Sequence, residues 1–133
     1  MERLGVGIIG AGGIAGAHAK AYAQLAPAVE LMGVADIDED RARAFAARHQ
    51  VPFWTTEAEE LLRHDEIQLV SICTPHHLHA PLAIAAMEAG KHVLVEKPMA
   101  VSLEEADAMI ATAQRTKRRL GAIFQLRYEA DTR

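Results

Sequence analysis

The sequence predicts an α/β fold with a doubly wound parallel sheet of about six strands. Strand-length apolar runs alternate with helical patterns along the 133 residues, an arrangement typical of βαβ units. Most of these runs are continuously apolar, as expected of strands that helices cover on both faces. Because crossovers between parallel strands are right-handed, a doubly wound sheet is the simplest topology for this order of strands and helices. We expect residues 1–133 to form one domain.

Start and stop signals separate the predicted strands from the helices between them. The strands are expected at residues 4–9, 30–35, 52–54, 68–73, 92–96 and 120–124. Capping boxes, in which a hydroxyl and a carboxylate satisfy free backbone N–H groups, predict helix starts at Thr56 with Glu59 and at Ser102 with Glu105. The other signals are Asp38 as N-cap of a helix to about His49, and a helix over residues 80–89 with Pro81 in its first turn and Gly90 after its end.

The composition predicts an ordinary soluble domain. Hydrophobic residues make up 50% of the chain and charged residues 24%, and the net charge of -4 argues against a nucleic-acid partner. A basic cluster of Arg115, Lys117, Arg118 and Arg119 falls where a helix would end and complements the helix dipole there. Cys73 is the only cysteine, so we expect neither an internal disulfide nor a cysteine-based metal site, in keeping with a reducing cytoplasm.

The N-terminal stretch superficially resembles a signal peptide, because Arg3 precedes a mildly apolar segment that ends in an A-x-A pattern at residues 17–19. Six glycines from Gly5 to Gly16 interrupt that segment too often for an apolar helix. No apolar run approaches the ~20 residues that are needed to span a bilayer. We therefore expect neither export nor membrane insertion, and a cytoplasmic location.

A glycine-rich turn between the first predicted strand and the first helix matches the dinucleotide fingerprint G-x-G-x-x-G/A. It reads Gly10-Ala11-Gly12-Gly13-Ile14-Ala15. Gly10 permits the tight turn, Gly12 lets the backbone approach a pyrophosphate, and the small Ala15 lets the helix pack closely on the strand. The pyrophosphate would rest on N–H groups near Gly13 and Ile14, at the positive end of the helix dipole. The strand before the motif and the helix after it are the context that supports this interpretation.

An acidic residue, Asp36, ends the second predicted strand 21 positions after Ala15. Its carboxylate can accept hydrogen bonds from an adenosine ribose and would repel a 2′-phosphate, so NAD is favoured over NADP. Asp36 could instead start the following turn, but Asp38 is the better cap and leaves Asp36 free for the ribose. Arg41 and Arg43 could meet a 2′-phosphate, which keeps NADP open as the alternative cofactor.

The fourth predicted strand leads into Thr74-Pro75-His76-His77-Leu78-His79. Three histidines within four residues raise a metal-binding alternative, but His76 and His77 are adjacent and would point apart, and no Asp or Glu lies nearby. We expect no metal here. The strand lies beside the fingerprint strand across the topological switch point, so we predict that Thr74, Pro75, His76 and His79 border a cofactor. His79 is alternatively a structural histidine.

The fifth predicted strand ends at Glu96-Lys97-Pro98. Lys and Glu are rarely buried unless they are paired, and proline cannot donate to a ladder, so the sheet should end at Lys97. In open parallel sheets, ligands bind outside the carboxyl ends of the strands. The ammonium of Lys97 is therefore expected where a cofactor or substrate would bind, although a solvated strand end would give the same pattern.

Together, these motifs resemble the N-terminal Rossmann domain of the glucose-fructose oxidoreductase, inositol dehydrogenase and rhizopine-catabolism (Gfo/Idh/MocA) family. The resemblance covers essentially the whole chain. It rests on the glycine turn, on Val34-Ala35-Asp36, on residues 73–79, and on Ala89-Gly90-Lys91-His92-Val93-Leu94-Val95-Glu96-Lys97-Pro98. It implies an NAD(P)-dependent oxidoreductase that transfers hydride between nicotinamide and a sugar, polyol or similar hydroxylated substrate.

The resemblance also implies roles for single residues. Lys97 would be the catalytic residue, hydrogen-bonded to the substrate hydroxyl that becomes a carbonyl. Glu96 and Pro98 would shape the approach of this strand end to the cofactor. Thr74, Pro75, His76 and His79 would line the central part of the dinucleotide site. Gln125 and Arg127 fall where family members have polar residues that face nicotinamide or substrate.

Members of that family continue into a second α/β domain, which supplies substrate contacts and much of the oligomer interface. No counterpart of that domain lies within residues 1–133, so residues 126–133 would begin the connection to it, and the chain alone would bind cofactor without a complete active site. A non-catalytic dinucleotide-binding module, a truncated pseudoenzyme and an NAD-dependent glycosidase are the alternatives, whereas Ala15 and Lys97 disfavour a methyltransferase. A homo-oligomer formed through an uncovered apolar surface is a further expectation.

Overall fold

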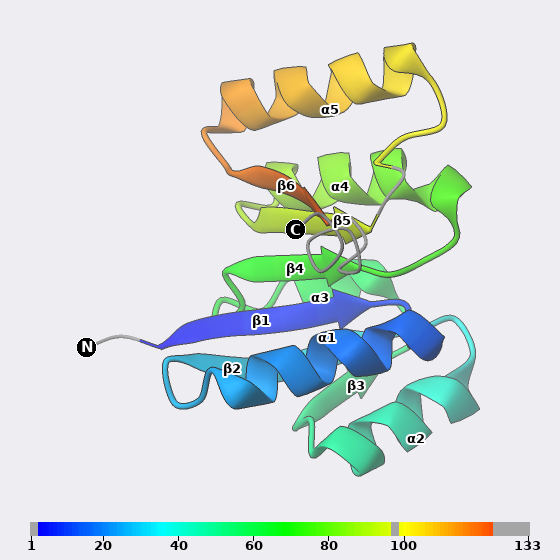
Figure 1. Ribbon diagram of the computed structural model, residues 1–133, viewed down its shortest axis with the longest axis vertical. Coiled ribbons are helices and arrows are strands. Elements are labelled where there is room, and N and C mark those ends of the chain that lie inside the picture. Colours follow the sequence, from blue (N-terminus) through cyan, green and yellow to red (C-terminus); the bar gives the residue numbers. More distant parts are fainter. Residues whose placement is uncertain (1–2, 97–98, 124–133) are drawn as a thin grey trace, which may run out of the picture.

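A computed structural model describes residues 3–96 and 99–123 of the chain. Its sheet has six parallel strands in the order β3-β2-β1-β4-β5-β6, the doubly wound order that the sequence predicts (Figure 1). The strands are β1 (Leu4–Ile9), β2 (Val29–Ala35), β3 (Phe53–Thr55), β4 (Leu69–Ile72), β5 (His92–Glu96) and β6 (Leu120–Ile123). The helices are α1 (Gly13–Gln24), α2 (Glu39–His49), α3 (Ala58–Leu62), α4 (His79–Glu88) and α5 (Leu103–Thr116), and a 3-10 turn, η1, covers His76–Leu78.

All six strands lie where the sequence predicts them, and their ends differ by no more than one residue within the described range. The third strand begins at Phe53 instead of Pro52, because proline has no N–H to donate to the ladder. In the register of the sheet, Ile9 pairs with both Ala35 and Ile72, and Ile72 pairs with Val95. The carboxyl ends of these four strands are therefore aligned at one edge.

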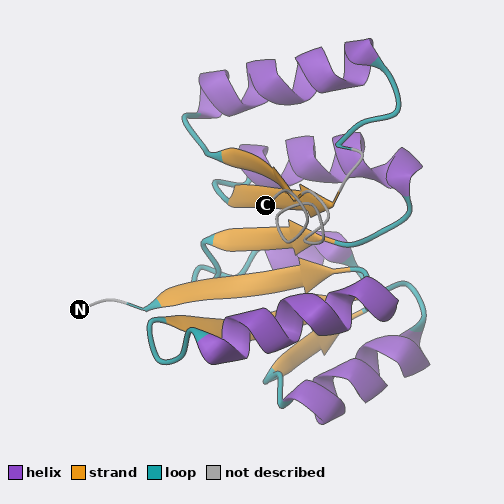
Figure 2. Cartoon of the chain, in the orientation of Figure 1, coloured by secondary structure: helices purple, strands orange, loops and turns teal. Residues whose placement is uncertain are grey.

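Helices cover both faces of the sheet (Figure 2). On the face of α1 and α2, Ile8 and Val34 pack with Ala15 and Phe45. On the face of α3, α4 and α5, a larger cluster of buried side chains includes Ile72, Val95, Met87 and Met109. Burial of this apolar surface is the main favourable contribution to folding. Within residues 3–96 and 99–123, no helix combines the length and apolar character needed to cross a membrane.

Two of the three predicted side-chain caps are confirmed, and the helix predicted over residues 80–89 is α4. The Asp38 carboxylate accepts a hydrogen bond from the Arg41 N–H at 3.1 Å, at the beginning of α2. The Ser102 hydroxyl accepts one from the Glu105 N–H at 3.1 Å, and the Glu105 carboxylate reaches back to the Val101 N–H at 3.1 Å. The hydrogen bonds of Ser102 and Glu105 form a capping box with one difference: the Glu105 carboxylate accepts from the N–H of Val101, the residue before the N-cap, instead of from the N-cap itself.

The predicted capping box of Thr56 with Glu59 is wrong. Helix α3 begins at Ala58 with Glu57 as its N-cap, and the hydroxyl that serves this turn belongs to Thr55. Thr55 accepts a hydrogen bond from the Glu57 N–H at 3.1 Å and donates one to the Glu60 carboxylate. Because Thr55 is the buried last residue of β3, the sheet fixes its hydroxyl at the start of the turn.

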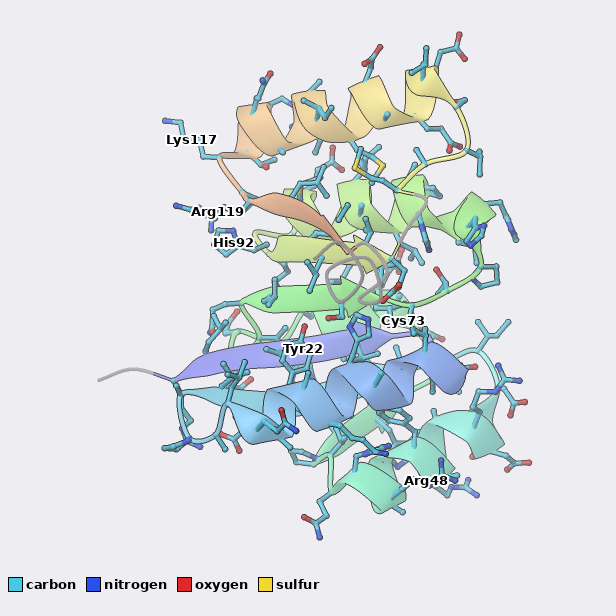
Figure 3. The ribbon with its side chains drawn as sticks, viewed as in Figure 1. Tyr22, Arg48, Cys73, His92, Lys117 and Arg119 are labelled. Atoms are coloured by element: carbon cyan, nitrogen blue, oxygen red, sulfur yellow. The ribbon has the colours of Figure 1, made fainter. Side chains whose placement is uncertain are left out.

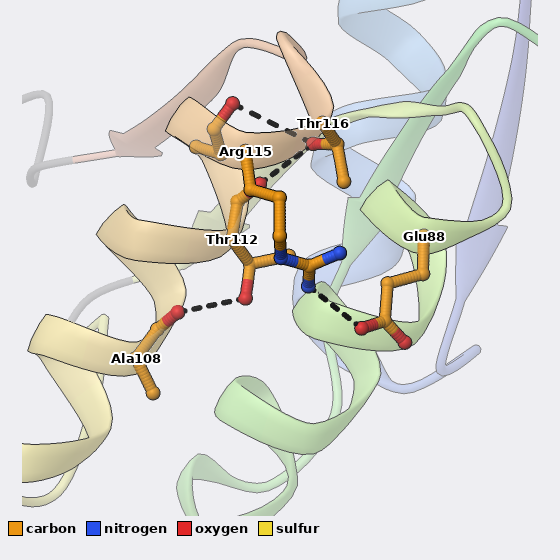
Figure 4. A network of polar contacts seen from close by, with 6 residues as sticks. Glu88, Ala108, Thr112, Arg115 and Thr116 are labelled. Atoms are coloured by element: carbon orange, nitrogen blue, oxygen red, sulfur yellow. Dashed lines mark hydrogen bonds and ion pairs between the residues drawn. The ribbon is translucent and has the colours of Figure 1, made fainter.

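The C-terminal half of α5 is tied to α4 and to its own backbone (Figure 4). The Arg115 guanidinium donates to Glu88 of α4 at 2.9 Å, an exposed pair that contributes little stability by itself. The hydroxyls of Thr112 and Thr116 donate to the carbonyls of Ala108 and Thr112 at 2.8 and 2.7 Å. The basic cluster therefore begins in the last turn of a helix, as predicted, and Lys117 continues it as a left-handed C-cap with φ of 61°.

Candidate functional site

A cleft of about 820 Å³ opens at the carboxyl edge of the sheet, where β1, β2 and β4 end. The chain leaves β1 and β4 toward opposite faces, so the cleft lies at the topological switch point, the usual ligand site of such sheets. Segments from distant parts of the sequence line it together. They include Gly10, Gly12, Asp36, Thr74, Pro75 and His76.

The glycine turn has the local geometry that the sequence predicts. Gly10 has a φ of +98°, and a Cβ atom there would lie 2.9 Å from the Cys73 carbonyl group, so only glycine fits. Ala15 is fully buried between α1 and the sheet. A Cβ atom at Gly12 or Gly13 would meet nothing within 4 Å. The backbone at the start of α1 is thus open on one side, where an anionic group can approach the N–H groups of the first turn.

Asp36 is bonded within the protein, contrary to the expectation that it is left free. Its Oδ2 atom accepts a hydrogen bond from the Ala11 N–H at 2.7 Å, and its Oδ1 atom accepts one from the Asp38 N–H at 2.8 Å. The side chain is buried, and the Arg41 guanidinium lies 3.7 Å from Oδ2. A carboxylate has about four acceptor positions, so Asp36 holds the glycine turn and retains acceptor capacity toward the cleft.

The two arginines near Asp36 differ in what they face. Arg41 lines the cleft and also a second hollow of about 450 Å³ on the α1 and α2 side, together with Arg48 (labelled in Figure 3). The Arg43 guanidinium lies over the Trp54 ring at 5.3 Å and pairs with the Glu39 carboxylate. The contacts of Arg43 are therefore with α2 and β3, and Trp54 packs against its guanidinium.

The loop after β4 lines the cleft with Thr74, Pro75 and His76. His79 is fully buried, and its Nε2 atom lies 3.0 Å from the Thr74 carbonyl oxygen. The centroids of the His79 and His76 rings are 5.6 Å apart. His79 therefore fixes the shape of the loop. The buried Thr74 hydroxyl has no hydrogen-bond partner among the described residues. Within the same part of the chain, no three His, Cys, Asp or Glu side chains gather in a group that could hold a metal ion.

Glu96 at the end of β5 reaches a histidine that the sequence did not single out. Its Oε2 atom lies 2.5 Å from Nε2 of His18 in α1. The His18 side chain is 6% exposed and the Glu96 side chain 18% exposed. The available signal was helical spacing, because His18 belongs to the buried face of α1 with Ala15, Ala19 and Tyr22.

Tyr22 in α1 and Cys73 after β4, both labelled in Figure 3, each interact with one member of this pair: the Tyr22 ring centroid lies 6.4 Å from that of His18, and Cys73 senses the charge of Glu96. The Tyr22 hydroxyl is hydrogen-bonded to the Ser71 hydroxyl, and burial raises the pKa of Tyr22. Burial, and to a smaller extent the charge of Glu96, raise the pKa of Cys73 to about 12. Both groups are therefore neutral near pH 7, and Cys73 is not a reactive thiolate.

Four of the predicted functional residues lie outside the described residues. They are Lys97, Pro98, Gln125 and Arg127, and the expected connection at residues 126–133 lies outside as well.

Comparison with known proteins agrees with this architecture. The family model described as "Oxidoreductase family, NAD-binding Rossmann fold" (GFO_IDH_MocA) matches residues 4–124. The chain also resembles the WlbA dehydrogenase of Bordetella pertussis, solved in complex with NADH and UDP-GlcNAcA, with a TM-score of 0.91 and 28% identity over 97% of this chain and 39% of that one.

Three curated relatives illustrate the range of the similarity. Glucose-6-phosphate 3-dehydrogenase of Bacillus subtilis is 42% identical over 92% of this chain and 34% of its own length. Inositol 2-dehydrogenase of Rubrobacter xylanophilus is 34% identical over 96% of this chain and 37% of its own length. A glycosyl hydrolase family 109 protein of a Shewanella species is 37% identical over 89% of this chain and 28% of its own length.

The chain spans little more than a third, or less, of the length of these relatives. The matching part is their NAD-binding Rossmann domain, because the family model covers nearly all of the described residues. The fold, the glycine turn at the switch point and these similarities lead to one conclusion: the chain belongs to the Gfo/Idh/MocA oxidoreductase family, with an NAD-binding Rossmann fold.

Proposed function

We propose that this chain is the cofactor-binding part of an NAD-dependent oxidoreductase that transfers hydride between nicotinamide and a hydroxylated substrate, such as a sugar or polyol. The observation that carries the proposal is the cleft of about 820 Å³, in which the glycine turn, Asp36 and the loop after β4 meet. Their chemistry fits a dinucleotide: open backbone N–H groups for a pyrophosphate, a carboxylate for a ribose, and a Thr74 hydroxyl that has no hydrogen-bond partner in the described part of the chain.

Each half of a dinucleotide would lie against different elements around the cleft. The first turn of α1, at Gly12, Gly13 and Ile14, would hold the pyrophosphate, and Asp36 at the end of β2 would hold the adenosine ribose. The other half would then extend over the ends of β4 and β5, past the loop at residues 74–79 toward Glu96 and Lys97. Bound there, the nicotinamide would supply the hydride donor or acceptor.

Asp36 favours NAD over NADP. Its buried carboxylate would repel a 2′-phosphate. The Arg41 guanidinium could offset this negative charge, but its ion pair with Asp36 is weak because the two groups are 3.7 Å apart and Arg41 is half-exposed. Arg43 is engaged with Trp54 and Glu39. NADP is therefore the second choice of cofactor.

The proposed substrate class follows the relatives and the sequence motif at the end of β5. Two relatives are named for the oxidation of glucose 6-phosphate and of inositol, and WlbA was solved with UDP-GlcNAcA, so hydroxylated carbohydrates recur. Lys97 would hydrogen-bond the substrate hydroxyl and carry its proton. Gln125 and Arg127 would face nicotinamide or substrate. Most substrate contacts would come from a further domain.

Glycoside cleavage is the second candidate, favoured by the relative named glycosyl hydrolase family 109 protein. A dinucleotide-binding module without catalysis is the third. All three share the cofactor cleft, so the reaction itself must separate them.

A chimera separates these functions. Residues 1–127 would replace the matching N-terminal region of the Bacillus subtilis glucose-6-phosphate 3-dehydrogenase, to which the chain is 42% identical. We expect the chimera to bind NADH and to reduce NAD when glucose 6-phosphate is added. The Lys97→Ala chimera should bind NADH equally well and lose turnover by about a hundredfold or more, as for a lost proton-transfer group.

The control is the Lys91→Ala chimera, because Lys91 lies at the opposite end of β5 and donates to the His64 carbonyl. A chimera that binds NADH but forms no reduced cofactor would support the non-catalytic module. Glycoside cleavage is tested in a second chimera, with the glycosyl hydrolase family 109 protein as the recipient. There, release of p-nitrophenol from nitrophenyl glycosides, dependent on NAD but without net reduction, would support that function.

A further inference from the structure

We infer that His18 is a positioning residue for the nicotinamide half of the site: it holds the Glu96 carboxylate at the end of β5, where the bound dinucleotide would pass. The inference rests on the proposed function, because it assigns His18 to one half of the proposed ligand. Neither His18 nor Glu96 is among the residues that line the cleft. Glu96 lies at the end of β5, over which the nicotinamide half would extend, and His18 would act through it.

The contact joins two elements that the sheet topology keeps apart. His18 lies in α1, the helix that the glycine turn opens, and Glu96 is the last residue of β5, with β4 between β1 and β5. The two side chains approach to 2.5 Å and bridge this separation on the α1 face. The same helix would thus present its N-terminus to the pyrophosphate and its buried face to Glu96.

Tyr22 and Cys73, which lie near the pair, do not replace His18 as the partner of Glu96. The Tyr22 ring stands edge-on to the His18 ring at 6.4 Å, and its hydroxyl is taken by Ser71. The Cys73 thiol stays neutral because its pKa is raised to about 12. Neither group takes part in the contact that holds the Glu96 carboxylate.

Glu96 retains acceptor capacity for a ligand. A carboxylate has about four acceptor positions, and the contact with His18 uses Oε2. With that oxygen held, the carboxylate has a fixed direction at the carboxyl end of β5 and can accept from a hydroxyl of the cofactor. Without His18, a side chain that is 18% exposed can turn toward solvent, and the bound cofactor would lose an oriented acceptor.

Position in the sheet makes the effect specific to one half of the ligand. Asp36 at the end of β2 and Glu96 at the end of β5 lie on opposite sides of the switch point between β1 and β4. ADP contains the adenosine and the two phosphates, whereas NADH adds the nicotinamide riboside. Loss of His18 should therefore weaken the binding of NADH and leave the binding of ADP unchanged.

The experiment measures the binding of NADH and of ADP to the 133-residue chain by calorimetry, together with the melting temperature of each variant. We expect His18→Leu to weaken NADH binding about tenfold, which corresponds to about 1.4 kcal/mol, without weakening ADP binding. His18→Gln should restore most of the NADH affinity, because the side-chain amide can donate to Glu96. Glu96→Gln should reproduce the selective loss.

Tyr22→Phe is the matched control, since it removes a buried hydroxyl one turn further along the same face of α1 and leaves the His18–Glu96 contact in place. It should bind both ligands like the unaltered chain. Equal weakening of NADH and ADP by His18→Leu, or an unchanged NADH affinity, would overturn the inference. If the unaltered chain bound neither ligand, the proposed function itself would fail, which is a different result.

Discussion

Asp36 is the residue at which structure and proposed chemistry meet most closely. Its two oxygens accept from the Ala11 and Asp38 N–H groups, so the carboxylate fixes both the glycine turn and the start of the next turn. Hydrogen bonds to a charged acceptor are worth roughly twice those between neutral groups. The same negative charge at the cleft would decide between a ribose hydroxyl and a 2′-phosphate.

Asp36→Asn should shift the cofactor preference toward NADP. The amide keeps one acceptor oxygen for the backbone and removes the charge that repels a 2′-phosphate, and Arg41 is then released from its ion pair. We expect the ratio of the NADPH and NADH dissociation constants to fall about tenfold or more, a difference of about 1.4 kcal/mol. Competition of NADPH against NADH, followed by fluorescence, measures this ratio.

Asp40→Asn is the control, because Asp40 is on the same segment, is 93% exposed at its side chain and pairs only weakly with Arg43. It should leave the ratio unchanged. An Asp36→Asn chain that binds NADH and NADPH in the original ratio would show that Asp36 does not select the cofactor.

At the scale of the elements, the edge strand β6 is held at its start by a histidine. The Arg119 N–H donates to Nδ1 of His92 at 2.9 Å, and both residues are labelled in Figure 3. An Nδ1 atom that accepts a hydrogen bond carries no proton. Burial, with the charges of Arg118 and Arg119, lowers the pKa of His92, which is consistent with this acceptor role.

Acidification should therefore destabilise the chain at this strand. Because the pKa of His92 is lower in the folded chain than its usual value of about 6.5, the unfolded state takes up the proton first, and stability declines as the pH falls below about 6.5. We expect the urea midpoint to decrease over that range and the Arg119 amide resonance to shift with a midpoint below 6.5.

His92→Asn should flatten the part of this pH dependence that belongs to β6. The pKa of His49 is also lowered, by burial and then by Arg48 and Lys20, so His49→Asn serves as the comparison that leaves the Arg119 resonance unaffected. An Arg119 resonance that does not move between pH 7.5 and 5 would contradict the assignment.

Local patterns predicted most of the elements. Strand positions followed from continuous apolar runs, and the caps at Asp38 and Ser102 followed from side-chain chemistry within four residues. Thr55 shows the limit of such patterns. Thr55 and Thr56 are adjacent and both have a hydroxyl, and the position at which β3 ends determines that Thr55 accepts the hydrogen bond of the turn. That choice depends on the sheet register, which a short sequence window does not contain.

Across the whole molecule, the fold and the glycine turn could be predicted, whereas the polar contacts beneath the site could not. The His18–Glu96 contact joins residues 78 positions apart, and the Ala11–Asp36 hydrogen bond spans 25 positions. Such contacts arise from the parallel order of β2, β1, β4 and β5, which brings one end of each strand to a common edge. Only the assembled sheet determines these distances.

Whether this edge of the sheet binds a dinucleotide is best measured by titrating the 133-residue chain with NADH. Trp54 is the only tryptophan, so energy transfer from Trp54 to the reduced nicotinamide reports binding to a single donor. We expect a saturable signal with one NADH per chain, reversed by ADP, because both ligands would use the glycine turn and Asp36. The absence of saturation up to millimolar NADH, or a signal that excess ADP does not reverse, would contradict it.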